Sequence, residues 1–538
     1  MPVASDVTQR RSDEGPAAVG SAPMNGAESL VRTLVASGVD TCFANPGTSE
    51  MHFVAALDQV EGVRCVLGLF EGVVTGAADG YGRVAGKPAA TLLHLGPGLA
   101  NGLANLHNAR RAATPIVNIV GDHATYHGQY DPPLASDVTG FARPVSAWVE
   151  TSLSAKTVAA DTARAVQAAR AAPGQIATLI LPADTAWQEA EGPAGPLPVA
   201  GPAPVDDRVV ERMASALRAG DRSAILMRGA SLSAGPLASA GRIAAATGAR
   251  LLCDTFAPVL ERGEGVTPVE RIPYFAEQIV EFLKDLDRIV LVGAKPPTAF
   301  FAYPGKPSWC LPEGCEVHYL AQAHEDGPGA LAALADRLGG GPGPVAALKL
   351  PEEPSDDARF NAHTIGQVIA RYLPDNAILS DDAATSSGPT LAALTGGRRH
   401  LHLPLTGGSI GQGIPLALGA SVAAPERKVV CITGDGSGLY TLQALWSLAR
   451  EACDVTVVVF ANRAYKILSV ELERVGVAAP GAKATDMLSL RNPDISWARL
   501  AQGLGVEATE ATDLRQFRDQ FADAMGRRGP RLIEAILR

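Results

Sequence analysis

Charged side chains are scarce in this chain. Asp, Glu, Lys and Arg make up 19% of the 538 residues, whereas hydrophobic residues make up 47%. This balance is typical of a globular chain with large buried cores and excludes an intrinsically disordered protein. The 56 acidic residues outnumber the 46 basic ones, so the formal net charge is −10. Because binding to a phosphate backbone needs a basic face, we expect no nucleic acid partner.

Long hydrophobic runs, paired cysteines and a dinucleotide fingerprint are also missing. No apolar run approaches the roughly 18 residues needed to span a bilayer, so we expect no membrane partner. The first 23 residues lack the apolar core of a secretory signal and are expected to form a disordered tail. The seven cysteines include no C-x-x-C, which favours reduced thiols, no structural zinc and a cytoplasmic location. The absence of G-x-G-x-x-G weighs against a nicotinamide or flavin dehydrogenase.

Short β-branched runs alternate with Ala-rich stretches of helical spacing. This pattern predicts βα units and buried parallel sheets. Two Pro- and Gly-rich linkers, 189–207 and 339–357, divide the chain into 24–188, 204–338 and 355–538. We therefore expect an α/β protein of three domains, each a largely parallel sheet flanked by helices. The runs that predict strands are TPIVNIVG, ATLILPA, SAILMRG, RIVLVGA, NAILSD, KVVCITG and VTVVVFAN.

The segment KVVCITGDGSG…VTVVVFAN places two oxygen ligands at the ends of consecutive strands. Asp435 follows one strand, and Asn462 follows the next, 27 residues later (462 − 435). The carboxyl ends of parallel strands meet at one edge of a sheet, where α/β proteins bind ligands. Oxygen-only ligands suit Mg²⁺, and Gly434 and Gly436 would let the backbone approach a phosphate at a helix N-terminus. The alternative is an ordinary strand-to-helix turn with a capping Asp, which the spacing to Asn462 disfavours.

This GDG-to-Asn spacing resembles the signature of thiamine-diphosphate enzymes. The resemblance implies that Mg²⁺ is held by Asp435, Asn462 and the main-chain carbonyl of Ala464, with Ser437 among the cofactor-binding residues. The motif usually closes with two asparagines, but Ala461 stands at the first position here. Arg463 replaces a more usual glycine, and the sequence does not predict the effect.

Such an enzyme needs a carboxylic acid to activate the aminopyrimidine of its cofactor. Glu71 lies in CVLGLFEGVVTGAADGYGR, between apolar residues. A buried carboxylate is costly unless it is paired, hydrogen-bonded or protonated. The segment resembles the family's activating-acid motif, which implies that Glu71 bonds the pyrimidine ring nitrogen. The alternative is a helix-start glutamate bonded to backbone N–H groups.

The order of further segments is similar to the acetolactate synthase large-subunit and benzoylformate decarboxylase branch of this family. ANPGTSEMHF, with Asn45 and Pro46, resembles its early loop. TGGSIGQG implies that the Gly408 carbonyl receives the pyrimidine amino group and that Ile410 supports the bent cofactor. SDDAATSSG implies diphosphate contacts from Thr385 and Ser386. In this family the first and third domains of one site come from different subunits, which implies a homodimer or homotetramer.

Three residues bear on the substrate, and each has a structural alternative. His94 matches a catalytic histidine of the decarboxylases but could be satisfied by backbone partners. Thr48 matches a carboxylate-binding hydroxyl but could cap a turn. His123, between Asp122 and His127, could handle protons or lie in a surface loop.

The expected reaction is decarboxylation of a 2-oxo acid by thiamine diphosphate and Mg²⁺. The resemblance places transfer to a second carbonyl first, as in acetolactate synthases, and simple decarboxylation second. A substrate-directing glutamine is missing after the strand that ends near Asp122, which weakens the first choice. The stretch 253–275 contains no histidine, which weakens a specific benzoylformate assignment. Bound FAD is left open, and a non-catalytic paralogue is the alternative of another class.

Overall fold

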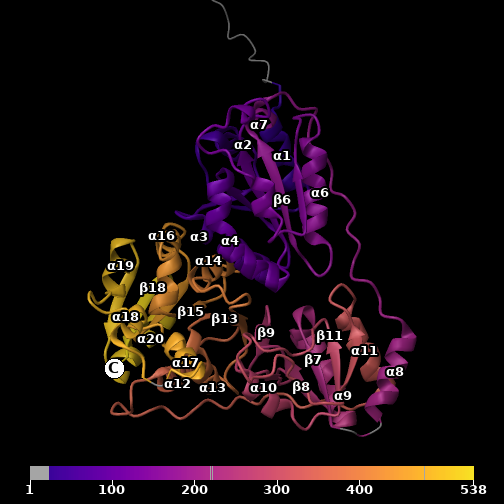
Figure 1. The fold of residues 1–538 in the computed structure, drawn as a ribbon, viewed down its shortest axis with the longest axis vertical. Helices are drawn as coiled ribbons and strands as arrows, with labels where there is room; N and C mark the ends of the chain where they lie inside the picture. The colour runs from indigo at the N-terminus through magenta and orange to yellow at the C-terminus, as the bar shows by residue number, and fades with distance from the viewer. Residues whose placement is uncertain (1–22, 219, 221, 478, 538) are drawn as a thin grey trace, which may run out of the picture.

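The computed structural model describes residues 23–218, 220, 222–477 and 479–537. Within these residues the chain forms three sheets, each flanked by helices (Figure 1). All seven runs that predict strands are strands. The expected α/β class is therefore confirmed, whereas the expected tail lies outside the described residues except for Pro23. No described helix is both long and apolar enough to cross a bilayer.

The first sheet has six strands in the order β2-β1-β3-β4-β6-β5, all parallel. Its strands are rich in β-branched and apolar residues because helices cover both faces. The strands are β1 (Thr41–Asn45), β2 (Arg64–Leu67), β3 (Ala89–Leu93), β4 (Ile116–Asp122), β5 (Trp148–Thr151) and β6 (Ile176–Pro182). The helices are α1 (Gly26–Ala36), α2 (Met51–Gln59), α3 (Glu71–Ala85), α4 (Leu95–Ala112), α5 (Val138–Ala142), α6 (Val158–Arg170) and α7 (Ala183–Trp187).

The middle sheet has five parallel strands in the order β10-β8-β7-β11-β12. The strands are β7 (Ser223–Met227), β8 (Arg250–Cys253), β10 (Glu270–Arg271), β11 (Arg288–Val292) and β12 (Glu316–Ala321). The helices are α8 (Asp207–Arg218), α9 (Ala234–Thr247), α10 (Ala276–Leu283) and α11 (Gly327–Leu338).

The third sheet has seven strands in the order β17-β18-β16-β15-β13-β14-β9. The strands are β9 (Leu260–Arg262), β13 (Ala377–Asp382), β14 (His400–Pro404), β15 (Val429–Gly434), β16 (Val455–Ala461), β17 (Glu507–Ala511) and β18 (Arg531–Ile536). The helices are α12 (Ala362–Tyr372), α13 (Ser387–Ala393), α14 (Gly413–Ala423), α15 (Asp435–Gly438), α16 (Ala444–Arg450), α17 (Lys466–Arg474), α18 (Ala482–Met487), α19 (Trp497–Gly503) and α20 (Leu514–Gly526).

One strand of the third sheet comes from the middle block of the chain. β9 lies between β8 and β10 in sequence but pairs antiparallel with β14, with Leu401 opposite Glu261. It is the one antiparallel pairing among the described strands of the three sheets. A three-residue strand carries too little alternation to be recognised in the sequence. The middle block is thus joined to the third sheet by main-chain hydrogen bonds.

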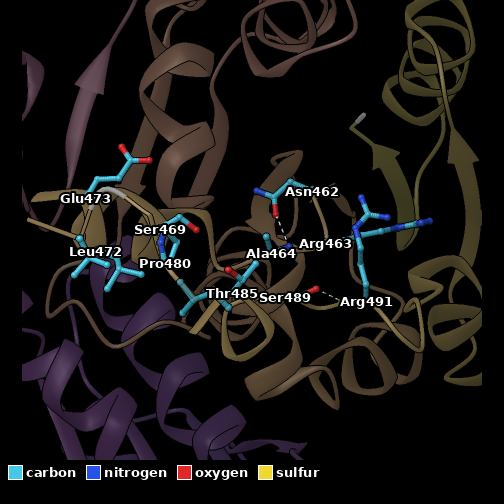
Figure 2. A pocket seen from close by; sticks show the side chains of 12 residues that line it. Asn462, Arg463, Ala464, Ser469, Leu472, Glu473, Pro480, Thr485, Ser489 and Arg491 are labelled. Carbon is cyan, nitrogen blue, oxygen red and sulfur yellow. Dashed lines mark hydrogen bonds between the residues drawn. The ribbon is translucent and has the colours of Figure 1, made fainter. Parts of the chain in front are cut away.

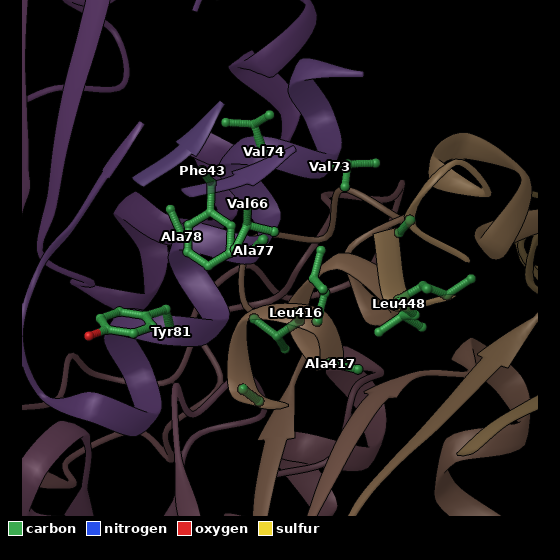
Figure 3. Close-up of a cluster of buried hydrophobic side chains, with 14 of the residues drawn as sticks. Phe43, Val66, Val73, Val74, Ala77, Ala78, Tyr81, Leu416, Ala417 and Leu448 are labelled. Atoms are coloured by element: carbon green, nitrogen blue, oxygen red, sulfur yellow. The ribbon is translucent and has the colours of Figure 1, made fainter. Parts of the chain in front are cut away.

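Helices α3 and α14 join the first and third sheets at very short range. A Cβ at Gly80 would lie 2.1 Å from the carbonyl oxygen of Leu416, and one at Gly419 would lie 1.8 Å from that of Ala77. Only glycine fits at these two positions, because any side chain would overlap a backbone atom. Figure 3 shows the apolar cluster around this contact, with Phe43 and other residues of the first sheet's domain facing the α14 side.

A buried ion pair completes this contact. Arg83 Nη2 lies 2.6 Å from Asp79 Oδ2, and both side chains are buried. The Gln412 amide donates to the same Asp79 oxygen at 2.5 Å, and Arg83 donates to the Pro404 carbonyl at 2.9 Å. The pair therefore fixes the loop between β14 and α14 against α3.

Candidate active site

Glu71 is the first residue of α3, and 6% of its surface is exposed. The Asn101 amide of α4 donates to its Oε2 at 3.0 Å. The first turn of a helix favours negative charge because its N–H groups are free. Glu71 is therefore a nearly buried carboxylate with a side-chain partner, as an activating acid requires.

A glutamate that sequence reasoning missed lies beside His94. Glu50 is 3% exposed, and its Oε2 lies 2.8 Å from His94 Nδ1. The same carboxylate accepts hydrogen bonds from the Gly47 N–H and the Ser49 hydroxyl, both at 2.8 Å. These bonds fix the carboxylate, which in turn orients the imidazole. The register pairs Asn45 with Leu93, so the ends of β1 and β3 could have been expected to meet here.

Glu71 and His94 converge on Gly98. A Cβ at Gly98 would lie 3.1 Å from Glu71 Oε1 and 3.3 Å from His94 Cβ. A side chain at this position would crowd both residues, so the first turn of α4 is kept clear between them. The structure thus brings together two of the predicted site residues and adds Glu50.

Thr48 and His123 follow β1 and β4, whose ends lie at the same edge of the first sheet as Glu50. Thr48 begins the short turn Thr48–Glu50 and is exposed, whereas Ser49 Oγ lies 3.4 Å from His94 Nδ1. His123 follows β4, its ring packs on His127, and its Nε2 is buried without a hydrogen-bond partner in the described part of the chain. Burial raises the pKa of the adjacent Asp122 carboxyl. Both roles stay predictions.

The predicted metal ligands meet at the ends of β15 and β16. These strands are parallel neighbours, and Gly434 pairs with Phe460. The buried Asp435 carboxylate accepts the N–H of Gly436 at 3.0 Å and that of Arg463 at 2.5 Å. The Asn462 side-chain oxygen accepts the Ala464 N–H at 2.9 Å (Figure 2). Burial raises the pKa of Asp435, so a bound cation would stabilise its ionised form.

This donor set fits Mg²⁺. One carboxylate, one amide oxygen and one carbonyl are hard oxygen ligands, and magnesium commonly takes its remaining ligands from water and phosphate. Arg463 has φ +57°, which explains why glycine is usual at this position. Its backbone bond to Asp435 and its ion pair with Asp494 accompany this strained conformation.

The turn after β15 and the loop after β13, where the sequence predicts diphosphate contacts, lie at the same edge of the third sheet. Asp382 pairs with Thr433, so the two loops lie side by side. A Cβ at Gly436 would lie 2.4 Å from the Tyr465 ring, so this turn tolerates no side chain there. The small residues Gly434, Ser437, Thr385 and Ser386 leave N–H groups and hydroxyls at this edge, as a diphosphate requires.

A cavity of about 350 Å³ opens beside the metal-ligand loop (Figure 2). It lies between this loop, α17 and the segment around α18, and its charged lining residues are Arg463, Glu473 and Arg491. The loop therefore borders open space. The lining residues are Asn462, Arg463, Ala464, Ser469, Leu472, Glu473, Val477, Pro480, Thr485, Leu488, Ser489 and Arg491.

The loop predicted to receive the pyrimidine is held by α4 and by Asp382. His107 Nε2 lies 3.0 Å from the Gly407 carbonyl, and the Asn108 amide donates to the Ser409 carbonyl at 2.8 Å. Asp382, whose pKa burial raises to about 7, accepts N–H groups on both sides of Gln412. Gly408 has φ +78°, and Ile410 is half-buried.

Within one chain, this loop and Glu71 contact different ends of α4. Glu71 lies at Gly98 and Asn101, whereas the loop contacts His107 and Asn108. At 1.5 Å per residue, Gly98 and His107 are separated by about 14 Å along the helix. The acid and the loop of one chain therefore do not face the same small ring.

The carboxyl edge of the middle sheet does not fit FAD. The N-terminus of α9 donates to the Glu261 carboxylate, and that of α11 is capped by Asp326. The Arg228 side chain forms an ion pair with Asp254 and also donates to the Arg111 carbonyl. Carboxylates thus occupy the positions where a dinucleotide pyrophosphate would need N–H groups.

The two half-sites define the class of enzymes that use thiamine diphosphate. Residues 24–138 match the thiamine pyrophosphate enzyme N-terminal TPP binding domain, and 387–535 match the C-terminal TPP binding domain. The chain is 50% identical to a Mycobacterium tuberculosis protein provisionally named acetolactate synthase large subunit IlvX, over 96% of this chain and 99% of that protein. The chain belongs to the thiamine pyrophosphate enzyme family.

Two further relatives carry decarboxylase names. The chain is 27% identical to benzoylformate decarboxylase of Pseudomonas aeruginosa, over 92% of this chain and 96% of that protein. The structure of a Rhodococcus jostii thiamine diphosphate-dependent 4-hydroxybenzoylformate decarboxylase superposes with a TM-score of 0.84. That structure is 23% identical and covers 96% of this chain and 99% of its own, which shows a common fold.

Proposed function

We propose that the chain binds thiamine diphosphate through Mg²⁺ and decarboxylates a 2-oxo acid. Asp435, Asn462 and the Ala464 carbonyl would hold the metal, and the turns after β13 and β15 would hold the diphosphate. When bound, the cofactor would supply a nucleophilic carbon that adds to the ketone and a cationic ring that accepts the electron pair left when CO₂ departs. The oxygen donor set and the small residues of these turns support this assignment.

The observation that most directly supports this proposal is that Glu71, His94 and Glu50 lie close together. Glu71 would share a proton with the pyrimidine ring nitrogen and so activate the cofactor. Glu50 engages Nδ1 of His94, which leaves Nε2 to carry a proton to or from the substrate. A residue that protonates the carbon left after CO₂ loss favours release of an aldehyde.

Transfer to a second carbonyl is the second candidate. The relative with 50% identity carries an acetolactate synthase name, and this supports carboligation. Both reactions share the decarboxylation step, so they differ only in whether a proton or a second carbonyl compound captures the product carbon.

We further propose that the complete site forms between two copies of the chain. The distance along α4 keeps Glu71 away from the Gly408 loop of its own chain. A two-fold related copy could bring its Glu71 to this loop, which would give a homodimer, or a homotetramer built from two such dimers.

A product assay tests the reaction. The protein is supplied with thiamine diphosphate, Mg²⁺ and each of pyruvate, a branched 2-oxo acid and benzoylformate, with and without benzaldehyde. We expect CO₂ and mainly aldehyde, with a roughly 10²–10⁴-fold lower rate in His94→Ala if the imidazole transfers the proton. His363→Ala, an exposed histidine of α12, is the matched control. Acetolactate from pyruvate as the main product would favour carboligation, and no CO₂ from any acid would overturn both.

A further inference from the structure

A cluster of aromatic side chains of the middle block, here called the aromatic wall, lies next to the Gly408 loop. Its members follow the carboxyl ends of β8, β10 and β11 and are Phe256, Tyr274, Phe275, Phe300, Phe301 and Tyr303. Phe300 is central, with ring centroids 5.3 Å from Phe256, 5.4 Å from Tyr274 and 4.6 Å from Phe301. Phe300 is 41% exposed and Phe301 is 51% exposed. The wall thus combines rings that support one another with open apolar surface.

The wall stands between two segments assigned to the cofactor. On one side, Phe300 Cζ lies 2.8 Å from the position that a Cβ would take at Gly408. On the other side, the Tyr303 hydroxyl, beside Phe301, donates to Glu471 of α17 at 2.5 Å. α17 begins two residues after Ala464, one of the proposed metal ligands. The wall therefore borders the region between the pyrimidine loop and the metal loop.

The charged groups Arg474, Glu277 and Glu471, which lie beside the wall, are paired with one another. Arg474 lies 2.9 Å from Glu277 Oε2 and 3.3 Å from Glu471 Oε2. Its guanidinium also lies over the Phe275 and Tyr303 rings, 4.3 and 5.5 Å from their centroids. The hydrogen bond from Arg474 lowers the pKa of Glu277 to about 2, so the pair stays ionised. Recognition at this surface therefore depends on apolar contact.

We propose that the aromatic wall receives the side chain of the 2-oxo acid, and that this side chain is an aromatic or large branched apolar group. The proposal rests on the function proposed above. An aryl group can pack edge-on or offset against Phe300 and remove apolar surface from water. The methyl group of pyruvate covers little of the two exposed rings, so pyruvate is the poorer substrate.

The test compares Phe300→Ala and Phe300→Leu with the unchanged holoenzyme. Tyr319→Ala, an exposed aromatic of β12 outside the wall, is the control. We expect the unchanged enzyme to prefer benzoylformate to pyruvate at least tenfold in kcat/KM. Phe300→Ala should lower kcat/KM for benzoylformate about 10–100-fold and for pyruvate less than threefold. Phe300→Leu should retain most activity on a branched 2-oxo acid.

Calorimetric binding of benzoylformate to the same proteins separates the two proposals. If Phe300→Ala binds benzoylformate more weakly and the unchanged protein turns over no 2-oxo acid, the wall is a binding site for the aryl group but the proposed function is wrong. If Phe300→Ala lowers kcat/KM equally for benzoylformate and pyruvate, or for neither, the proposed role of the wall is wrong. A lower oligomeric state of Phe300→Ala in sedimentation, with unchanged selectivity, would also overturn it, because a second copy would then cover these rings.

Discussion

The first and third sheets are built alike, yet their carboxyl edges carry different chemistry. The first sheet gathers titratable side chains, Glu50, His94 and Glu71, around the start of α4. The third sheet gathers main-chain N–H groups, small residues and the oxygen ligands Asp435 and Asn462. Under the proposed function, the first sheet would handle protons and the third would anchor the cofactor. The carboxyl edge of the middle sheet carries neither set of groups and instead presents the aromatic wall, beside the carboxylates of Glu261 and Asp326 at its helix N-termini.

The largest effect on turnover is expected from a substitution in the first sheet's domain. Glu71→Gln should lower turnover roughly 10²–10⁴-fold, because the amide cannot exchange a proton with the pyrimidine. Cofactor affinity, measured by calorimetry, should change little. Glu28→Gln alters another first-turn acid, on α1, and should leave turnover unchanged. Full activity in Glu71→Gln would contradict the proposed role of the first sheet in proton transfer.

The second-largest effect is expected at the third sheet, on the binding of thiamine diphosphate. Asp435→Ala should weaken Mg²⁺-dependent binding of thiamine diphosphate by roughly 100-fold or more, since even residues that only support metal ligands contribute 10–100-fold. Titration of the cofactor with and without Mg²⁺ measures this loss. Asp494→Ala, which removes the ion-pair partner of Arg463, serves as the control. A mutant that still binds in a metal-dependent way would contradict the ligand assignment.

A smaller effect on turnover is expected at Glu50. Glu50→Gln should lower kcat about tenfold and leave cofactor affinity unchanged, because the residue orients His94 without touching the cofactor. Since the two residues act as a unit, the double variant with His94→Ala should be no slower than His94→Ala alone. Additive losses in the steady-state rates would show that Glu50 supports the fold and not the imidazole.

The smallest effect is expected at Arg463. Replacement by glycine should relieve about 1 kcal/mol of left-handed backbone strain, and the exposed ion pair lost with it contributes at most about that much. Thermal unfolding should therefore show equal or slightly greater stability, with metal affinity unchanged. A marked loss of cofactor affinity would instead mean that the guanidinium binds the diphosphate.

The sequence predicted the features that depend on local pattern. Strand runs such as KVVCITG are continuous and β-branched, and parallel strand ends explain why Asp435 and Asn462 meet. Glu50 was not predicted because it follows Thr48 and Ser49 in a turn. An acidic residue at such a place is ordinarily interpreted as a helix cap. The contact of Phe300 with Gly408 joins segments 108 residues apart (408 − 300) and leaves no periodic signal. The contacts of Arg228 with Asp254 and of the α9 N-terminus with Glu261 likewise join segments that are distant in sequence.

Strand β9 has a consequence for the independence of the middle block. The chain leaves the middle sheet after β8, adds one strand to the third sheet and returns to form β10. Detaching the middle block would break the β9–β14 hydrogen bonds and expose an edge of each partner. The middle and third sheets should consequently unfold as one cooperative unit, which hydrogen exchange would show as linked protection of β9 and β14.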